Sequence, residues 1–220
     1  MPKSKITSND EFKKLIHDGM TIMIGGFMTD GTPEHLIDLM VETGAKNLTL
    51  INNDGGYPDR GIGKLIANGQ VKTLMASHVG LNPTVAKLIN ANQLELILVP
   101  QGTLAERIRA KGAGLGGILT PTGVGTLVAE GKQLIDVDGK QYLLETPLRA
   151  DLAIVEATYA DTFGNGVNIG TTRNFNPLMA MAADKVVLGT YEVKEIGEID
   201  PSIVTIFGVL VDYVVKVEGE

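Results

Sequence analysis

The chain has 220 residues, 44% hydrophobic and 20% charged, with a net charge of −7 at pH 7. This length and apolar fraction can bury a sizeable core, and we expect a single domain over residues 1–220. The acidic balance and the scarcity of aromatic residues disfavour a nucleic-acid-binding surface. The absence of cysteine excludes disulfides, thiolate nucleophiles and Cys-ligated metals. No segment has the pattern of a signal peptide or a membrane span, so the sequence predicts a cytoplasmic protein that binds neither nucleic acid nor membrane.

The first half of the chain repeats the order strand, loop, helix. An amphipathic helix at 7–17 leads into an apolar strand at 20–24, which resembles a strand buried on both faces. The remaining elements of this half are strands at 48–52, 71–76 and 94–100, and helices at 34–43, 62–68, 83–91 and 104–112. This alternation predicts an open, mostly parallel α/β sheet flanked by helices.

The apolar strand at 20–24 ends at Gly25 and Gly26, which let the backbone turn sharply and allow close approach to the main chain. Thr32 and Pro33 then give a helix start, with Thr32 as N-cap and Pro33 at the first helical position. A helix N-terminus suits a phosphate, a carboxylate or an oxyanion. The residues fit a tight turn equally well, and they match neither a dinucleotide fingerprint nor a P-loop.

The second half of the chain is less regular. Residues 112–131 are rich in glycine and predict an ordered but irregular loop that forms a wall of an active site or interface. Alternating apolar residues around Asp138 and Gly139 predict a β-hairpin over 133–145. The remaining expected elements are strands at 151–157, 186–188 and 209–217, and a helix at 176–183.

Polar side chains follow two of the expected strands. Asn52 and Asn53 end one strand, and Gln101 follows Pro100 at the end of another. Because ligands of open α/β sheets bind beyond the carboxyl ends of the strands, these amides could stabilise a carbonyl oxygen or an oxyanion. The sequence alone slightly favours the alternative that they are turn residues, since asparagine tolerates left-handed backbone geometry.

No residue stands out as a nucleophile or a metal ligand. The three histidines have no accompanying serine, cysteine or H-x-x-x-H pattern, which favours surface or supporting positions. The acids carry no motif that selects one of them for covalent catalysis; they include Glu34, Glu42, Glu106, Glu130 and Glu156.

Five blocks, in order, cover nearly the whole chain: DGMTIMIGGFMTDGTP, LINND, VPQGTLAERIRAKGAGLGGILTPTGVGTLV, PLRADLAIVEA and RNFNPLMAMAAD. Together they resemble the alpha subunit of a family I coenzyme A transferase, of the 3-oxoacid and acetate (butyrate–acetoacetate) type. The order and number of the blocks make the resemblance far more specific than the glycine motif alone.

The resemblance implies a transferase that moves CoA between carboxylic acids by a ping-pong route. In this family a glutamate of the beta subunit carries the covalent intermediate, so no catalytic residue is expected in this chain. The resemblance also implies two alpha and two beta chains, no permanently bound cofactor and no metal, with coenzyme A or acyl-CoA as substrate.

Carried over by motif, the resemblance assigns two sets of site residues. Asn52, Asn53 and Gln101 would support the thioester oxygen and the substrate carboxylate. The CoA or acyl site would be lined by the glycine loop, which comprises Gly25, Gly26, Phe27, Met28, Thr29, Asp30 and Gly31. The alternatives are a stand-alone phosphate-ester or nucleotide-binding α/β protein and a scaffold whose site has decayed.

Overall fold

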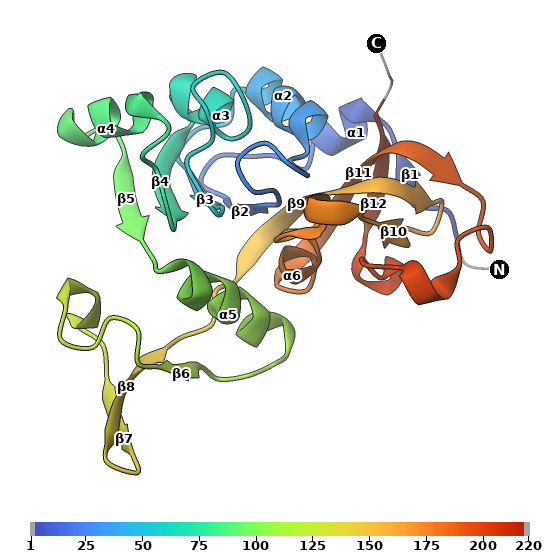
Figure 1. Cartoon of the computed structure of the whole chain (residues 1–220). Coiled ribbons are helices and arrows are strands. Elements are labelled where there is room, and N and C mark those ends of the chain that lie inside the picture. Colours follow the sequence, from blue (N-terminus) through green and yellow to red (C-terminus); the bar gives the residue numbers. More distant parts are fainter. Residues whose placement is uncertain (1–2, 218–220) are drawn as a thin grey trace.

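The computed structural model describes residues 3–217 and is built around one large, mostly parallel sheet (Figure 1). Each of its eight consecutively paired strands runs parallel to its neighbours, and the short β10 (Gly166–Val167) pairs antiparallel with β9. In sheet order these strands are β1 (Ile6–Thr7), β12 (Tyr213–Lys216), β11 (Ala183–Lys194), β9 (Ala150–Asp161), β2 (Thr21–Ile24), β3 (Leu48–Ile51), β4 (Val71–Ala76) and β5 (Glu95–Leu98). The predicted fold class is therefore confirmed.

Helices cover both faces of this sheet (Figure 1). On one face lie α1 (Asn9–Lys13), α2 (Glu34–Thr43), α3 (Gly63–Ala67) and α4 (Pro83–Asn90), which contribute apolar residues to one core. On the other face lie α5 (Gln101–Gly112) and α6 (Asn176–Ala180), which contribute to a second core. The parallel strands are therefore buried on both sides, as this class of sheet requires.

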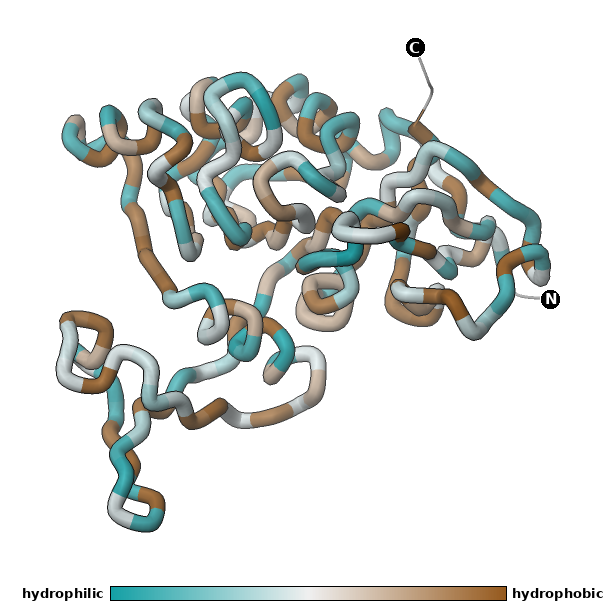
Figure 2. Tube along the Cα trace, viewed as in Figure 1, coloured by the Kyte–Doolittle hydropathy of each residue, from teal (hydrophilic) through white to brown (hydrophobic). Residues whose placement is uncertain are grey.

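The strand β2 lies in the middle of the sheet, between β9 and β3. Ile22 and Ile24 pack into the first core, whereas Met23 packs into the second, and all three side chains are fully buried. This alternation confirms the prediction of a strand covered on both faces. At the far edge of the sheet, β5 is also largely apolar (Figure 2), but Leu98 there is 57% exposed.

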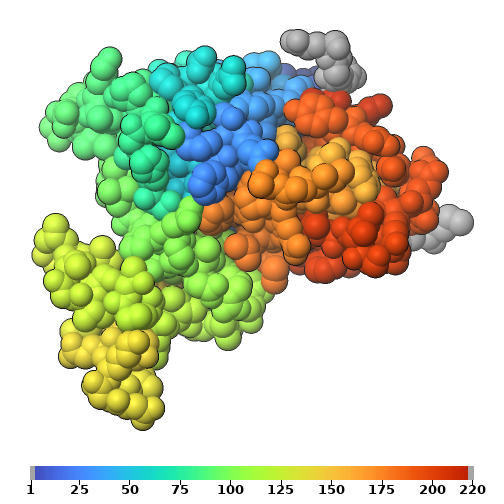
Figure 3. Space-filling model, viewed as in Figure 1, coloured from blue at the N-terminus to red at the C-terminus, as the bar shows by residue number. Residues whose placement is uncertain are grey.

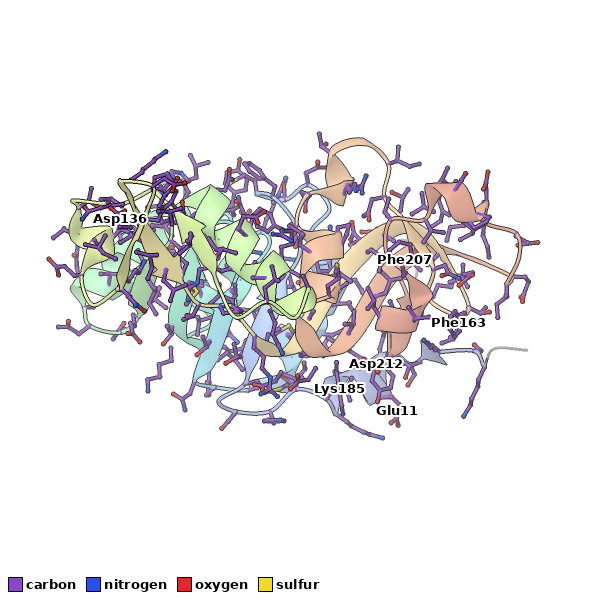
Figure 4. The ribbon with its side chains drawn as sticks, turned by 90° about the horizontal axis from the view of Figure 1, so that it is seen from below. Glu11, Asp136, Phe163, Lys185, Phe207 and Asp212 are labelled. Atoms are coloured by element: carbon purple, nitrogen blue, oxygen red, sulfur yellow. The ribbon has the colours of Figure 1, made fainter. Side chains whose placement is uncertain are left out.

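A smaller antiparallel sheet projects from the main body, and we call residues 113–146 the arm (Figures 1 and 3). Its strands, in sheet order, are β6 (Ile118–Thr120), β8 (Lys140–Glu145) and β7 (Leu134–Val137). The predicted hairpin is confirmed: β7 and β8 are joined by Asp138 and Gly139, both with positive φ (53° and 77°). Asp136 of this hairpin lies at the opposite end of the molecule from Phe163 (Figure 4).

Several predicted helix boundaries are wrong. The first helix spans only 9–13: residues 6–7 pair with β12 as a strand, and the helix ends at its C-cap, Lys14. α5 begins at Gln101 rather than at 104, so the loop after β5 is shorter than predicted. Thr32 is not the N-cap of α2: Pro33 occupies that position, and the Thr32 hydroxyl donates to the carbonyl of Met28 (3.3 Å).

Several predictions in the second half also need correction. The helix predicted at 176–183 ends at Ala180, and the strand predicted at 186–188 spans Ala183–Lys194. The glycine-rich segment 112–131 is not wholly irregular, because it contains β6 and a short 3₁₀ helix at Leu127–Ala129. The last strand spans only 213–216, since 208–210 form a 3₁₀ helix. Asp212 precedes that strand, and its carboxylate accepts the N–H of Val186 (2.8 Å). Within residues 3–217, no helix is both long and apolar enough to cross a membrane.

Candidate functional site

The loops after β2, β3 and β5 meet at the carboxyl edge of the sheet. Gln101 Nε2, at the start of α5, donates to Asn53 Oδ1 (2.7 Å). The N–H of Met28, in the loop after β2, donates to Asp54 Oδ2 (2.7 Å). Parallel strands bring their carboxyl ends to one edge, and these two hydrogen bonds join the three loops there.

Asn52 points inward and has a structural role in this arrangement. Its side chain is 4% exposed. Its Nδ2 donates to the carbonyl of Ile24 (2.6 Å), and its Oδ1 accepts the N–H of Asp54 (3.0 Å). Asn52 therefore joins the end of β3 to the end of β2, and both its nitrogen and its oxygen are hydrogen-bonded within the chain.

Asn53 connects the buried interior to the exposed Gln101. It is 2% exposed and donates from Nδ2 to Asp54 Oδ2 (2.8 Å). Its Oδ1 accepts both from Gln101 and from the hydroxyl of Ser77 (3.3 Å). Asn53 thus orients Gln101, which is the one member of the predicted trio exposed at the surface.

Asp54 is a site residue that the sequence reasoning did not select. Its carboxylate is 2% exposed and accepts three hydrogen bonds: from the N–H groups of Met28 and Gly56 (2.7 and 2.9 Å) and from Asn53. Three donors satisfy the hydrogen-bonding capacity that a buried carboxylate would otherwise lose on leaving water. The available signal was the run of polar residues at 52–54 directly after an apolar strand.

Glycine is required at three positions of the loop after β2, because other parts of the chain fill the space of a side chain. A Cβ at Gly25 would lie 1.8 Å from Asn176 Oδ1, and one at Gly26 would lie 2.0 Å from Thr32 Oγ1. A Cβ at Gly31 would lie 2.5 Å from the carbonyl oxygen of Thr172. The close approach predicted at Gly25 therefore involves the chain's own Asn176 rather than open space for a ligand.

The backbone of the same loop is already hydrogen-bonded. The N–H of Gly25 donates to the carbonyl of Ile154 (2.9 Å), and the N–H of Gly26 donates to Asn174 Oδ1 (3.1 Å). The N–H of Phe27 donates to the carbonyl of Asp30 (3.1 Å), and the N–H of Asp30 donates to the carbonyl of Phe27 (3.0 Å). These contacts hold the loop in one conformation. They leave the side chain of Phe27, 46% exposed, at its outer surface.

Asn176 anchors this loop, although its place in the sequence predicts only a helix start. It is completely buried. Its Oδ1 accepts the N–H of Glu156 (3.0 Å), and its Nδ2 donates to the carbonyls of Gly31 and Thr172 (2.9 and 2.8 Å). The N-F-N pattern at 174–176 was the sequence signal, since Asn174 bonds the same loop.

Acidic side chains lie beside the loop. Burial raises the pKa of the Glu156 carboxyl to about 8, and the nearby charges of Glu34 and Asp30 contribute in the same direction. Glu34 accepts the N–H of Gly61 (2.7 Å) and pairs with Lys64 Nζ (2.8 Å). The negative charges of Asp30 and Glu34 disfavour a phosphate at the start of α2. Among residues 3–217, no group of three or more metal-binding side chains could hold an ion.

Comparison with known proteins identifies the family. The model of the family described as coenzyme A transferase matches residues 6–217. The chain belongs to the coenzyme A transferase family. Two further comparisons show which members it resembles.

Two relatives of this transferase chain match over nearly all of their length. An acetoacetyl-CoA:acetate/butyrate CoA transferase alpha subunit of Clostridium acetobutylicum is 50% identical, over 97% of this chain and 98% of its own. A chain of the 3-oxoadipate CoA-transferase of Acinetobacter baylyi is 47% identical, over 93% of this chain and 90% of its own. The identities are nearly equal although the two names give different acids.

The fold of the transferase chain matches a crystal structure of an acyl-CoA transferase from E. coli O157:H7, described as a thioester complex with CoA. The TM-score is 0.86 and the identity 25%, over 97% of this chain. The match spans 47% of that E. coli chain, so the present chain corresponds to about half of it.

Proposed function

We propose that this chain is the alpha subunit of a heteromeric, cytoplasmic CoA-transferase, with residues 1–220 forming a single domain. It would move CoA between a short-chain acyl-CoA and a carboxylic acid of the acetate, butyrate or acetoacetate type. The near-complete coverage of the Clostridium alpha subunit supports this assignment. A beta chain would complete the enzyme, with two alpha and two beta chains in the assembly.

The chemistry would proceed through a carboxylate of the beta chain. That glutamate attacks the thioester carbonyl, which forms an acyl anhydride and releases the CoA thiolate. The thiolate then attacks the glutamyl carbonyl, giving an enzyme thioester and the free carboxylic acid. The reverse sequence with a second acid completes the transfer, so coenzyme A is a substrate and no metal or permanent cofactor is needed.

The observation that carries the proposal is the convergence of Asn52, Asn53 and Gln101 beside the glycine loop. Negative charge develops on the thioester oxygen during attack, and preoriented N–H donors stabilise it. The Gln101 amide has two N–H groups, of which one is bonded to Asn53. The second N–H is the donor that we assign to the substrate oxygen.

The remaining members of the site would act through position. Asn53 would orient Gln101, and Asn52 would hold the strand ends together. The segment Gly25–Gly31 would line the CoA or acyl site, with Phe27 as its exposed apolar side chain and Met28, Thr29 and Asp30 completing the turn.

Exposed apolar side chains support a partner chain. Large apolar patches on the surface of a soluble protein commonly mark interaction sites. On this chain several such residues lie on the arm, on β5 and on the segment before β12; they include Leu127 (82%), Val209 (78%), Leu98 (57%) and Phe207 (56%). The match to only about half of the E. coli acyl-CoA transferase chain also supports a partner chain that would supply the other half.

Neither alternative has comparable support. A phosphate-ester or nucleotide would meet the acidic side chains of Asp30 and Glu34 beside the glycine loop rather than a cationic clamp. A scaffold with a decayed site would have no reason to keep the buried hydrogen bonds of Asn53 and Asp54.

The deciding experiment is a CoA-transfer assay with acetyl-CoA and acetoacetate or butyrate. It would be run on the purified chain alone and on the chain co-expressed with the CoA-transferase beta chain of the same organism. Activity only in the mixture, abolished by changing one beta-chain glutamate to glutamine, would support the proposal. Appreciable turnover by this chain alone would refute the assignment of the nucleophile to a partner.

A further inference from the structure

A groove of about 320 Å³ lies between the glycine loop, α5 and α6. Its walls include Phe27, Ala105, Phe175 and Leu178, and Gln101 and Asn174 lie among its polar neighbours. The volume is at the lower end of the range for small-molecule sites. Because Phe27 and Gln101 also belong to the proposed transferase site, the groove is continuous with it.

The groove presents a mainly apolar lining to a ligand, because most of the polar groups of Asn174 and Gln101 are hydrogen-bonded to other parts of the chain. Asn174 Oδ1 accepts the N–H groups of Gly26 and Phe175, and its Nδ2 donates to the carbonyls of Asp30 and Thr171. Gln101 directs one N–H to Asn53. A ligand in the groove would therefore contact hydrocarbon along its length and meet an amide at one end.

No lysine, arginine or histidine is among the residues that line the groove within the described part of the chain. The nearby arginines of α5 are directed elsewhere: Arg109 pairs with Glu106 (2.8 Å), and Arg107 Nε donates to the carbonyl of Thr146 (2.7 Å). Arg173 precedes Asn174 but does not line the groove. A second carboxylate on a substrate would therefore lose water without gaining a cation.

We propose that this groove holds the hydrocarbon part of the acyl group and selects short, uncharged acyl chains over those that end in a second carboxylate. The proposal rests on the transferase function proposed above and adds the residues that choose the substrate. Leu178 and Ala105 are the specificity-determining side chains, contributed by α6 and α5. The names of the relatives leave this choice open, because chains of nearly equal identity are named for monocarboxylic and dicarboxylic acids.

The expected preference follows from burial. Each methylene removed from water favours binding, so kcat/KM for butyryl-CoA should exceed that for acetyl-CoA by about 10-fold. Succinyl-CoA has a similar chain length but carries a charge, and its kcat/KM should fall below that of butyryl-CoA by about 100-fold.

The test uses the complex of this chain with its beta chain and compares the wild type with Leu178→Arg. The cation at the groove should raise the succinyl-to-butyryl ratio of kcat/KM by about 10-fold or more. Leu81→Arg is the matched control, because Leu81 is 51% exposed and does not line the groove. That control should leave the ratio unchanged.

A second variant keeps the test decisive if Leu178→Arg does not assemble. Ala105→Leu narrows the groove without adding charge, so the butyryl-to-acetyl ratio should fall by about fivefold or more. An unchanged ratio in an active variant would overturn the inference while leaving the transferase function intact, as would a wild type that prefers succinyl-CoA. A wild-type complex that transfers CoA from none of these donors would instead refute the proposed function.

Discussion

Gln101 Nε2 donates a 2.7 Å hydrogen bond to Asn53 Oδ1, across 48 positions of the sequence. The orientation of both amides follows from Asp54. Its carboxylate oxygens only accept hydrogen bonds, and two backbone N–H groups already donate to them, so the Asn53 amide must turn its nitrogen, Nδ2, toward Asp54. The Asn53 oxygen, Oδ1, therefore faces Gln101 and accepts the hydrogen bond that Gln101 Nε2 donates. The exposed glutamine is therefore aimed by a buried network.

Replacing Gln101 by alanine should reduce activity without weakening the fold. The side chain is exposed, so the free energy of unfolding should change by less than about 0.5 kcal/mol. Loss of one donor to a developing oxyanion should lower kcat of the complex by about 100-fold. Steady-state kinetics of the complex and urea denaturation of the chain check the two halves of this prediction.

Asn52 provides the contrast to Gln101. Asn52→Ala leaves the carbonyl of Ile24 and the N–H of Asp54 without their buried partner, so it should cost about 2 kcal/mol of stability. If Gln101→Ala destabilised the chain more than Asn52→Ala, the division into an exposed and a structural amide would be wrong.

The elements that sequence predicted best are those fixed by local pattern. The strand at 71–76 and the hairpin turn at Asp138 and Gly139 follow from alternation and from positive φ. The different roles of Asn52 and Gln101 could not be predicted, since both follow strands and only the three-dimensional fold turns one inward. The prediction of Thr32 as an N-cap was wrong because the loop after β2 turns back on itself, so the Thr32 hydroxyl donates to the carbonyl of Met28 instead.

Gly25→Ala should destabilise the chain, because the new Cβ would overlap Asn176 Oδ1 at 1.8 Å. Overpacking of this kind costs about 1–3 kcal/mol. Gly116→Ala is the control, since no atom lies within 4 Å of a Cβ there, and its stability should stay within about 0.5 kcal/mol of the wild type. Urea denaturation measures both.

A double-mutant cycle identifies the cause of that loss. Asn176→Ala removes the side chain that fills the space beside Gly25, so the double variant should be more stable than the sum of the single effects predicts. Simple additivity would show that the cost of Gly25→Ala arises from a contact other than Asn176.

Glu145 stabilises the arm from its buried position. It is 2% exposed and pairs with Lys132 at 2.6 Å and Arg107 at 3.6 Å. Glu145→Gln leaves two cations facing each other, which should weaken the arm by about 3 kcal/mol. Amide hydrogen exchange should speed up in β6 and β8 but not in β2. Glu106→Gln, which breaks an exposed pair with Arg109, should have almost no effect on the same amides.

Glu156 should make stability fall as the pH rises. Its folded pKa of about 8 lies above the unfolded value of about 4.3, so the folded chain binds the extra proton between these limits. The contribution of Glu156 to the free energy of unfolding is therefore fully present below about pH 4. As the pH rises from there to about 8, this contribution falls by up to about 1.4 kcal/mol per pH unit. Glu156→Gln, which cannot ionise, should remove this slope and be more stable than the wild type at about pH 8. Urea denaturation from about pH 5 to about pH 9 measures the difference, with Glu130→Gln as control. Parallel profiles for wild type and Glu156→Gln would show that this carboxyl titrates as it does in water.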